Sequence, residues 1–188
     1  MKTREEALSV LYEFTKGEGL RKHALAVEAA MRAYARRFGE DEETWGIVGL
    51  LHDFDYEAHP SIEEHPFVGA RILRERGWPE VIVTGVLAHG SHTGEPHDTP
   101  LKKTIFAVDE LTGFITATAL VYGRSLANVT PERVRKKLKD KAFARQVNRQ
   151  EIELGLAEMA ELGIAPDEHI RFVVDALRPV AGELGLTP

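Results

Sequence analysis

The sequence contains no cysteine. This absence excludes disulfide bonds, thiolate metal sites and cysteine nucleophiles, and it is compatible with a reducing cytoplasm. Any bound metal ion would have to be held by nitrogen and oxygen donors. The chain also lacks a G-x-S-x-G nucleophile elbow, so covalent routes to hydrolysis have no visible residues.

Positive charge is in short supply, with 24 Lys and Arg against 30 Asp and Glu and a formal net charge of -6. This balance argues against nonspecific nucleic-acid binding through overall charge. We recognise neither a cleavable N-terminal signal nor an apolar run long enough to span a bilayer. We therefore expect a soluble, cytoplasmic protein without membrane or nucleic-acid partners, and the sequence does not indicate its oligomeric state.

Helix signals occur along the whole chain, and none of its segments demands a sheet. Apolar residues recur at spacings of three and four after residues that typically start helices. These start signals lie at Thr3, Asp41, Ser61, Thr130, Asn148 and Pro166. The chain is long enough for one hydrophobic core, and connections are short. We expect a single, compact all-α domain of roughly eight or nine helices, with one of them running from residue 61 to about 76.

The pair His52-Asp53 follows an apolar helical stretch and is the most informative local feature. His23 and Asp109 fall on the expected inner faces of two other helices. A buried carboxylate such as Asp109 is costly unless it is paired or metal-bound. One interpretation is therefore a shared metal site. The other is that both histidines are hydrogen-bonded core residues and that Asp109 pairs with a basic side chain such as Lys102.

The order of these four residues on separate helices resembles the HD superfamily of metal-dependent phosphohydrolases, in its HDIG-type branch. The likeness covers roughly residues 20 to 125, including the stretch His-Pro-Phe-Val-Gly-Ala at 65–70. Residues 126–188 would form a C-terminal helical extension of a single HD domain spanning residues 1–188. The resemblance implies that His23, His52, Asp53 and Asp109 bind a divalent metal ion inside the helical core.

Further histidines raise the question of a second metal ion. Two-metal members of the superfamily use additional histidines, and His65, His89 and His92 occupy the corresponding stretches. Each of these three could instead be an ordinary surface or loop residue. Residues 89–92 read His-Gly-Ser-His, where some two-metal relatives have adjacent histidines. We expect one or two ions, drawn from Mn, Fe, Co, Ni, Zn and Mg, with Asp53 as a bridge if the three histidines converge on its far side.

A metal-activated water would attack phosphorus without a protein nucleophile, and Asp53 would take part in catalysis as a ligand. Asp55 and Glu57 are second-tier candidate proton donors, because the pattern favours helix-end capping or a solvated charge for each of them. The basic run at 133–139 could steer a phosphate or form a solvated face. Three histidines are expected to be ordinary exposed residues: His59, His97 and His169.

The resemblance implies a phosphohydrolase acting on a nucleotide or another small phosphorylated metabolite. A different class remains open, namely a non-catalytic regulatory module that binds a metal ion or nucleotide. A lyase or oxygenase with a di-iron centre is a third alternative. The substrate itself is not predicted, since fold-level likeness does not transfer specificity.

Overall fold

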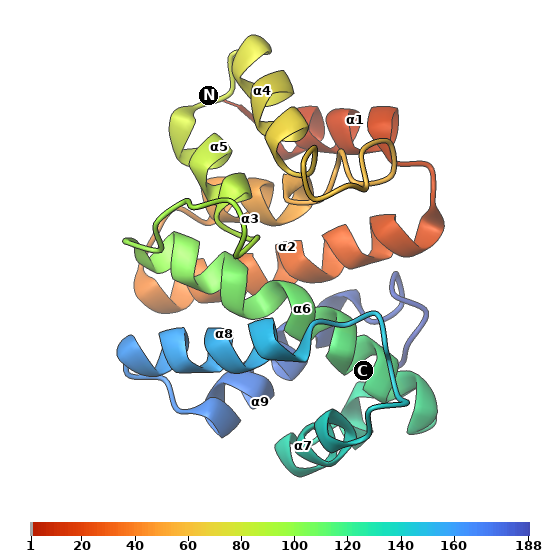
Figure 1. The fold of residues 1–188 in the computed structure, drawn as a ribbon. Coiled ribbons are helices and arrows are strands. Elements are labelled where there is room, and N and C mark those ends of the chain that lie inside the picture. Colours follow the sequence, from red (N-terminus) through yellow and green to blue (C-terminus); the bar gives the residue numbers. More distant parts are fainter. Residues whose placement is uncertain (1) are drawn as a thin grey trace.

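Nine α-helices and two short 3₁₀ helices make up the computed structural model, which describes residues 2–188 and has no named β-strand within them (Figure 1). The elements are α1 (Arg4–Phe14), α2 (Glu18–Phe38), α3 (Glu42–Leu51), α4 (Phe67–Glu75), α5 (Glu80–Leu87), α6 (Pro100–Val121), η1 (Leu126–Asn128), α7 (Pro131–Lys139), α8 (Arg149–Glu161), α9 (Pro166–Leu177) and η2 (Arg178–Val180). The prediction of an all-α fold with eight or nine helices is confirmed.

The longest helix, α6, lies in the middle of the structure, between α2 and α8 (Figure 1). Most of its side chains are buried, including Ile105, Leu111 and Phe114. By length and hydropathy alone, α6 could span a membrane, contrary to the expectation that the chain has no apolar run of that length. In the structure, however, 67% of its most apolar 18-residue stretch is buried inside the protein. The apolar character of α6 is therefore that of a central core helix.

Most of the expected helix starts are confirmed by their caps. Thr3 forms a capping box with Glu6, while the side chains of Asp41, Thr130 and Asn148 each accept a hydrogen bond from a backbone N–H three residues later. These bonds satisfy amide groups that have no partner within the helix.

The expected helix start at Ser61 is wrong, because residues 61–66 form turns and α4 begins only at Phe67. Pro66 explains the difference. Its ring disfavours helical backbone angles at the preceding His65, and it has no N–H to continue a helix. The turn places His65 ahead of the helix instead of on it.

A glycine brings α3 unusually close to α2. A Cβ atom on Gly49 would lie 2.8 Å from the Cα atom of Glu28, a distance that real side chains do not reach. Glycine therefore permits a contact between the two backbones. The close approach matters for function because it carries the end of α3, with His52, toward His23 on α2.

His169 is fully buried, so the expectation that it is exposed is wrong. Its ring Nε2–H donates to the carbonyl oxygen of Ala107 at 3.1 Å, and the hydroxyl of Tyr34 donates to Nδ1 at 2.5 Å. The other two histidines of this set, His59 and His97, are partly exposed and lie against glutamates. Nothing in the helical pattern around residue 169 distinguished a buried, bonded histidine from an exposed one.

The pH dependence of stability should report this buried histidine. Burial lowers the pKa of His169 to about 4, from an ordinary value of 6.5. Above pH 6.5 the ring is neutral whether the chain is folded or not, so the contribution is then fully present. Between pH 6.5 and about 4 only the unfolded chain takes up the proton, and the free energy of unfolding should fall by about 3 kcal/mol.

Denaturant unfolding at several pH values measures this effect against a His169→Gln variant, which cannot titrate at this position. The wild-type protein should lose more stability than the variant over the same pH interval. Equal pH dependence in the two proteins would contradict the assignment.

Candidate metal centre

Four side chains from three parts of the fold meet at one point. His23 comes from the inner face of α2, and Asp109 comes from the middle of α6. His52 is the C-cap of α3, directly after its last residue Leu51, and Asp53 follows it in a turn. Because the helix ends at His52, the two adjacent side chains can face the same point, which they could not do on a continuing helix.

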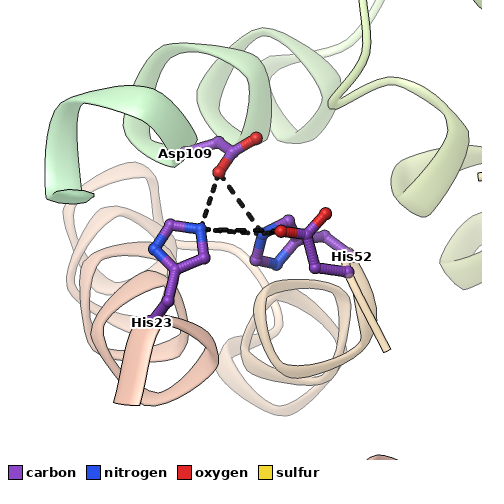
Figure 2. Close-up of side chains that lie close together, drawn as sticks. His23, His52 and Asp109 are labelled. Carbon is purple, nitrogen blue, oxygen red and sulfur yellow. Dashed lines mark hydrogen bonds and ion pairs between the residues drawn. The ribbon is translucent and has the colours of Figure 1, made fainter. Parts of the chain in front are cut away.

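The donor atoms of this first group lie close together. Nε2 of His23 is 2.9 Å from Oδ1 of Asp109 and 3.2 Å from Nε2 of His52 (Figure 2). Nε2 of His52 is 3.3 Å from Oδ1 of Asp109 and also 3.3 Å from Oδ2 of Asp53. One nitrogen or oxygen atom from each of the four residues lies within 4.8 Å of all the others.

A second group of donors lies on the other side of Asp53. Its Oδ1 atom is 3.1 Å from Nε2 of His65 and 3.3 Å from Nε2 of His89. The two imidazole nitrogens are 3.0 Å apart. Asp53 thus presents Oδ2 to the first group and Oδ1 to the second, which is the arrangement expected of a bridging carboxylate.

The orientation of three histidines is set by hydrogen bonds at their other ring nitrogen. Nδ1–H donates to the carbonyl of Gly49 in His52 and to the carbonyl of Val86 in His89. In His65 it donates to Oδ1 of Asp55 at 2.8 Å. In the neutral form of each ring, the Nε2 lone pair therefore points into the cluster, as it does in histidines that ligate metals.

The charges of the site call for a cation. Burial disfavours the charged form of His52, but the adjacent Asp53 and Asp109 carboxylates outweigh it and raise the pKa of His52 well above its ordinary value. Burial likewise opposes protonation of His65, whereas Asp53 and Asp55 raise its pKa to about 9. In the protein alone, protons on these rings balance the carboxylates. A divalent cation can take the place of those protons.

The residues fit a metal ion better than they fit a purely structural network. His65 and His89 direct two lone pairs at each other, so two neutral rings held in these orientations cannot bond to one another. Lys102, the alternative partner proposed for Asp109, pairs instead with Glu95 and Asp98. The all-nitrogen and oxygen donor set suits Mn, Fe, Co, Ni, Zn or Mg without selecting one of them.

Asp55 supports the second group from behind and does not face the pocket. It is fully buried, and its Oδ2 accepts a hydrogen bond from the backbone N–H of Gly69 at 2.7 Å. A Cβ atom on Gly69 would lie 2.8 Å from this carboxylate, so only glycine leaves room for it. Its other oxygen, Oδ1, accepts the hydrogen bond from His65. Asp55 is therefore a positioning residue and does not reach the pocket as the proton donor considered above.

Replacing Asp55 by asparagine should weaken metal binding at the second group about ten- to a hundredfold, because His65 loses the carboxylate that orients it. Titration with a divalent metal, followed by calorimetry, measures the change. The first group, which Asp55 does not contact, should keep its affinity. An unchanged second binding event would show that the Asp55–His65 hydrogen bond has no such role.

Glu57 also lies away from the cluster, so its candidacy as proton donor is corrected. Its Oε2 atom accepts hydrogen bonds from the backbone N–H groups of Lys16 and Gly17, at 2.5 and 3.2 Å. These bonds lower the pKa of Glu57. Its carboxylate holds the start of α2, which is the capping alternative considered for it.

His92 does not join either donor group. Its ring Nε2–H donates to the backbone carbonyl of His65 at 2.9 Å, and its side chain forms part of the nearby pocket wall. Of the three additional histidines, the structure therefore brings His65 and His89 to Asp53, while His92 contacts the backbone of one of them.

A pocket of about 760 Å³ opens directly onto the centre, and donors from both groups line it. Gly113 and Thr116 of α6 also line it, whereas Thr112 is buried and its hydroxyl donates a hydrogen bond to the carbonyl of Asp109. No residue of the basic run 133–139 reaches this pocket. Instead, two cationic side chains that sequence reasoning overlooked, Lys22 and Arg124, form part of its wall.

Glu110 is another residue of the pocket wall that the sequence did not single out. Burial and the neighbouring Asp109 carboxylate raise its pKa to about 7. Its Oε2 atom accepts a hydrogen bond from the backbone N–H of Asn148. The only available signal was its position next to Asp109, since a glutamate on a helix surface is otherwise unremarkable.

Comparisons with known proteins agree with this geometry at the level of the family. The family model described as the HD domain matches residues 20–113, which is half of the 188 residues. No curated protein and no solved structure matches the chain. The matched span contains every donor of both groups, and the helical fold holds them around Asp53. The chain belongs to the HD-domain family.

Proposed function

We propose that the protein is a metal-dependent phosphohydrolase that cleaves a phosphate ester of a nucleotide or another small phosphorylated metabolite. The observation that carries the proposal is the placement of Asp53, whose two oxygens face two donor groups at the floor of an open pocket. Two metal ions held by one bridging carboxylate are a recurrent arrangement in enzymes of phosphoryl transfer.

The residues divide the work in a simple way. His23, His52 and Asp109 would hold one cation together with Asp53, and His65 and His89 would hold the other. Bound cations would supply a hydroxide-like water and neutralise charge on the phosphoryl oxygens. The protein would also orient the metal ligands. The hydrogen bonds from the histidine rings to backbone carbonyls and to Asp55 do this.

Exposure of the centre favours catalysis over the regulatory alternative. A structural metal is enclosed by its protein ligands, whereas a catalytic one keeps a position open. Here the side chains of His23 and Asp53 are 21% and 20% exposed, and both line the pocket. A substrate could therefore reach the ligand atoms.

Hydrolysis assays after removal and stepwise return of divalent metal ions test the proposal. Phosphate release from nucleotides and chromogenic phosphate esters should depend on the added metal and be lost in Asp109→Ala. A matched control, Glu63→Ala, removes an exposed carboxylate outside the pocket and should remain active. A fully metal-loaded protein that hydrolyses none of these esters would overturn the proposal and favour the regulatory module. A di-iron spectrum after aerobic purification, without hydrolysis, would instead favour the lyase or oxygenase.

A further inference from the structure

The pocket is much longer than a phosphate group. Asp109, Gly113, Thr116 and Leu120 follow one another on one face of α6, and all four line it. At the rise of an α-helix, these residues span about 16 Å. A ligand whose phosphate sits at the metal centre therefore has room for an extended body along α6.

Part of the pocket wall is apolar. Leu20 of α2 and Leu184 near the C-terminus line it together with Leu120 and Val147. Leu120, one residue before the end of α6, is 44% exposed. An apolar ligand segment covering these side chains would gain from their removal from water.

Two positive charges meet on the pocket wall, where Lys22 of α2 and Arg124, three residues beyond the end of α6, both lie beside Gly185 of the C-terminal segment. The position that a Cβ atom of Gly185 would occupy lies 3.5 Å from Nη2 of Arg124 and 3.7 Å from Nζ of Lys22. These two cations come from segments about a hundred residues apart in the chain, yet they meet at one place on the pocket wall.

Both cations are available to a ligand. Arg124 forms no ion pair within residues 2–188, and its Nη2 donates a hydrogen bond to the carbonyl of Gly185, at 3.0 Å. Lys22 pairs with the exposed Glu18 one turn earlier, an interaction of low strength in water. The two glutamates that line the pocket already have partners, since Glu110 accepts a hydrogen bond from the N–H of Asn148 and Glu151 accepts one from the hydroxyl of Ser91.

The C-terminal segment holds Arg124 in place. Thr187 donates its backbone N–H to the carbonyl of Arg124 at 2.8 Å, and its own carbonyl accepts from the N–H of Leu126 at 2.9 Å. Arg124 has a φ of 58°, in the left-handed region that non-glycine residues rarely adopt. Such backbone conformations persist only where the surrounding structure enforces them, and they are enriched at ligand sites.

We propose that Lys22 and Arg124 form a distal anion subsite, and that the substrate is an elongated phosphate ester with an apolar middle and a second anionic group, phosphate or carboxylate, at its far end. This inference rests on the proposed function for the placement of the first phosphate at the metal centre. It follows from one pocket that joins a metal centre, an apolar passage and a pair of cations.

Matched ligands test the subsite by binding, independently of turnover. We would compare n-alkyl monophosphates with alkane-α,ω-diol bisphosphates and ω-phosphoalkanoates of the same carbon number, over increasing chain length, by calorimetry on the metal-loaded protein. Above a threshold length, the second anionic group should improve the dissociation constant about tenfold, and the phosphate and carboxylate series show which group is preferred. Lys22→Gln and Arg124→Gln should each remove most of this gain while leaving monophosphate binding and metal content unchanged.

Lys136→Gln is the matched control, because it removes an exposed positive charge from α7 outside the pocket. If Arg124→Gln loosens the C-terminal segment, Lys22→Gln, which breaks only a surface pair, still decides the question. Equal binding of all ligand types at every length, or an equal loss in Lys136→Gln, would overturn the subsite. Hydrolysis of the monophosphates alone would then leave the proposed function intact, whereas tight bisphosphate binding without any hydrolysis would leave the subsite standing and refute the function.

Discussion

Replacing Asp53 by alanine should reduce the rate of phosphate-ester hydrolysis by about a thousandfold or more, because this residue serves both donor groups. Without its carboxylate, each group retains ligands from the other residues but loses the oxygen that joins them. Steady-state kinetics with a chromogenic phosphate ester, at saturating metal, measures the effect.

Two variants make this result interpretable. His89→Ala removes a ligand of the second group only, so comparison with Asp109→Ala, which affects only the first, shows how much each group contributes. Each of these two variants should lose less bound metal than Asp53→Ala. Substantial activity in Asp53→Ala at ordinary metal concentrations would contradict the bridging role.

Replacing Phe54 by alanine should lower the free energy of unfolding by about 4 kcal/mol, and the midpoint of thermal unfolding by roughly 10 °C. Phe54 lies between Asp53 and Asp55 in the sequence, and its side chain is fully buried. Its ring packs edge to face against that of Phe14, with centroids 5.2 Å apart. Its carbonyl accepts a hydrogen bond from the hydroxyl of Thr15 at 3.0 Å. The alanine variant leaves a cavity beneath the turn that carries the metal ligands.

Thermal and denaturant unfolding followed by circular dichroism measures this loss, with Phe54→Leu as the control that keeps most of the buried volume. The leucine variant should lose much less stability and retain its metal content. Equal stability of the alanine variant and the wild-type protein would show that this anchor does not hold the turn.

The parts of the site that could be predicted from the sequence are those encoded by local patterns. The apolar spacing on three helices placed His23, His52 and Asp109 on inner faces, and the resemblance to HD proteins joined them into one site. Cap residues such as Thr130 marked helix starts because their side chains bond to the next turn, which is a local interaction.

The remaining features depend on contacts between distant segments. His65 reaches Asp53 from the turn before α4. The helical pattern does not show this turn, because Pro66 makes α4 begin later than the pattern indicates. Arg124 faces the pocket because the C-terminal residues pair with its backbone. Neither relation has a periodic signature in the sequence, and the burial of His169 likewise depends on Tyr34, far away in the chain.

Metal content per chain tests the central claim most directly. We would load wild-type protein, His89→Ala and Asp53→Ala with the same divalent metal, remove excess metal by gel filtration, and determine the bound metal by elemental analysis. The two donor groups predict two ions in the wild-type protein, one in His89→Ala and close to none in Asp53→Ala. Full metal occupancy in Asp53→Ala would contradict the claim that this carboxylate joins two metal sites.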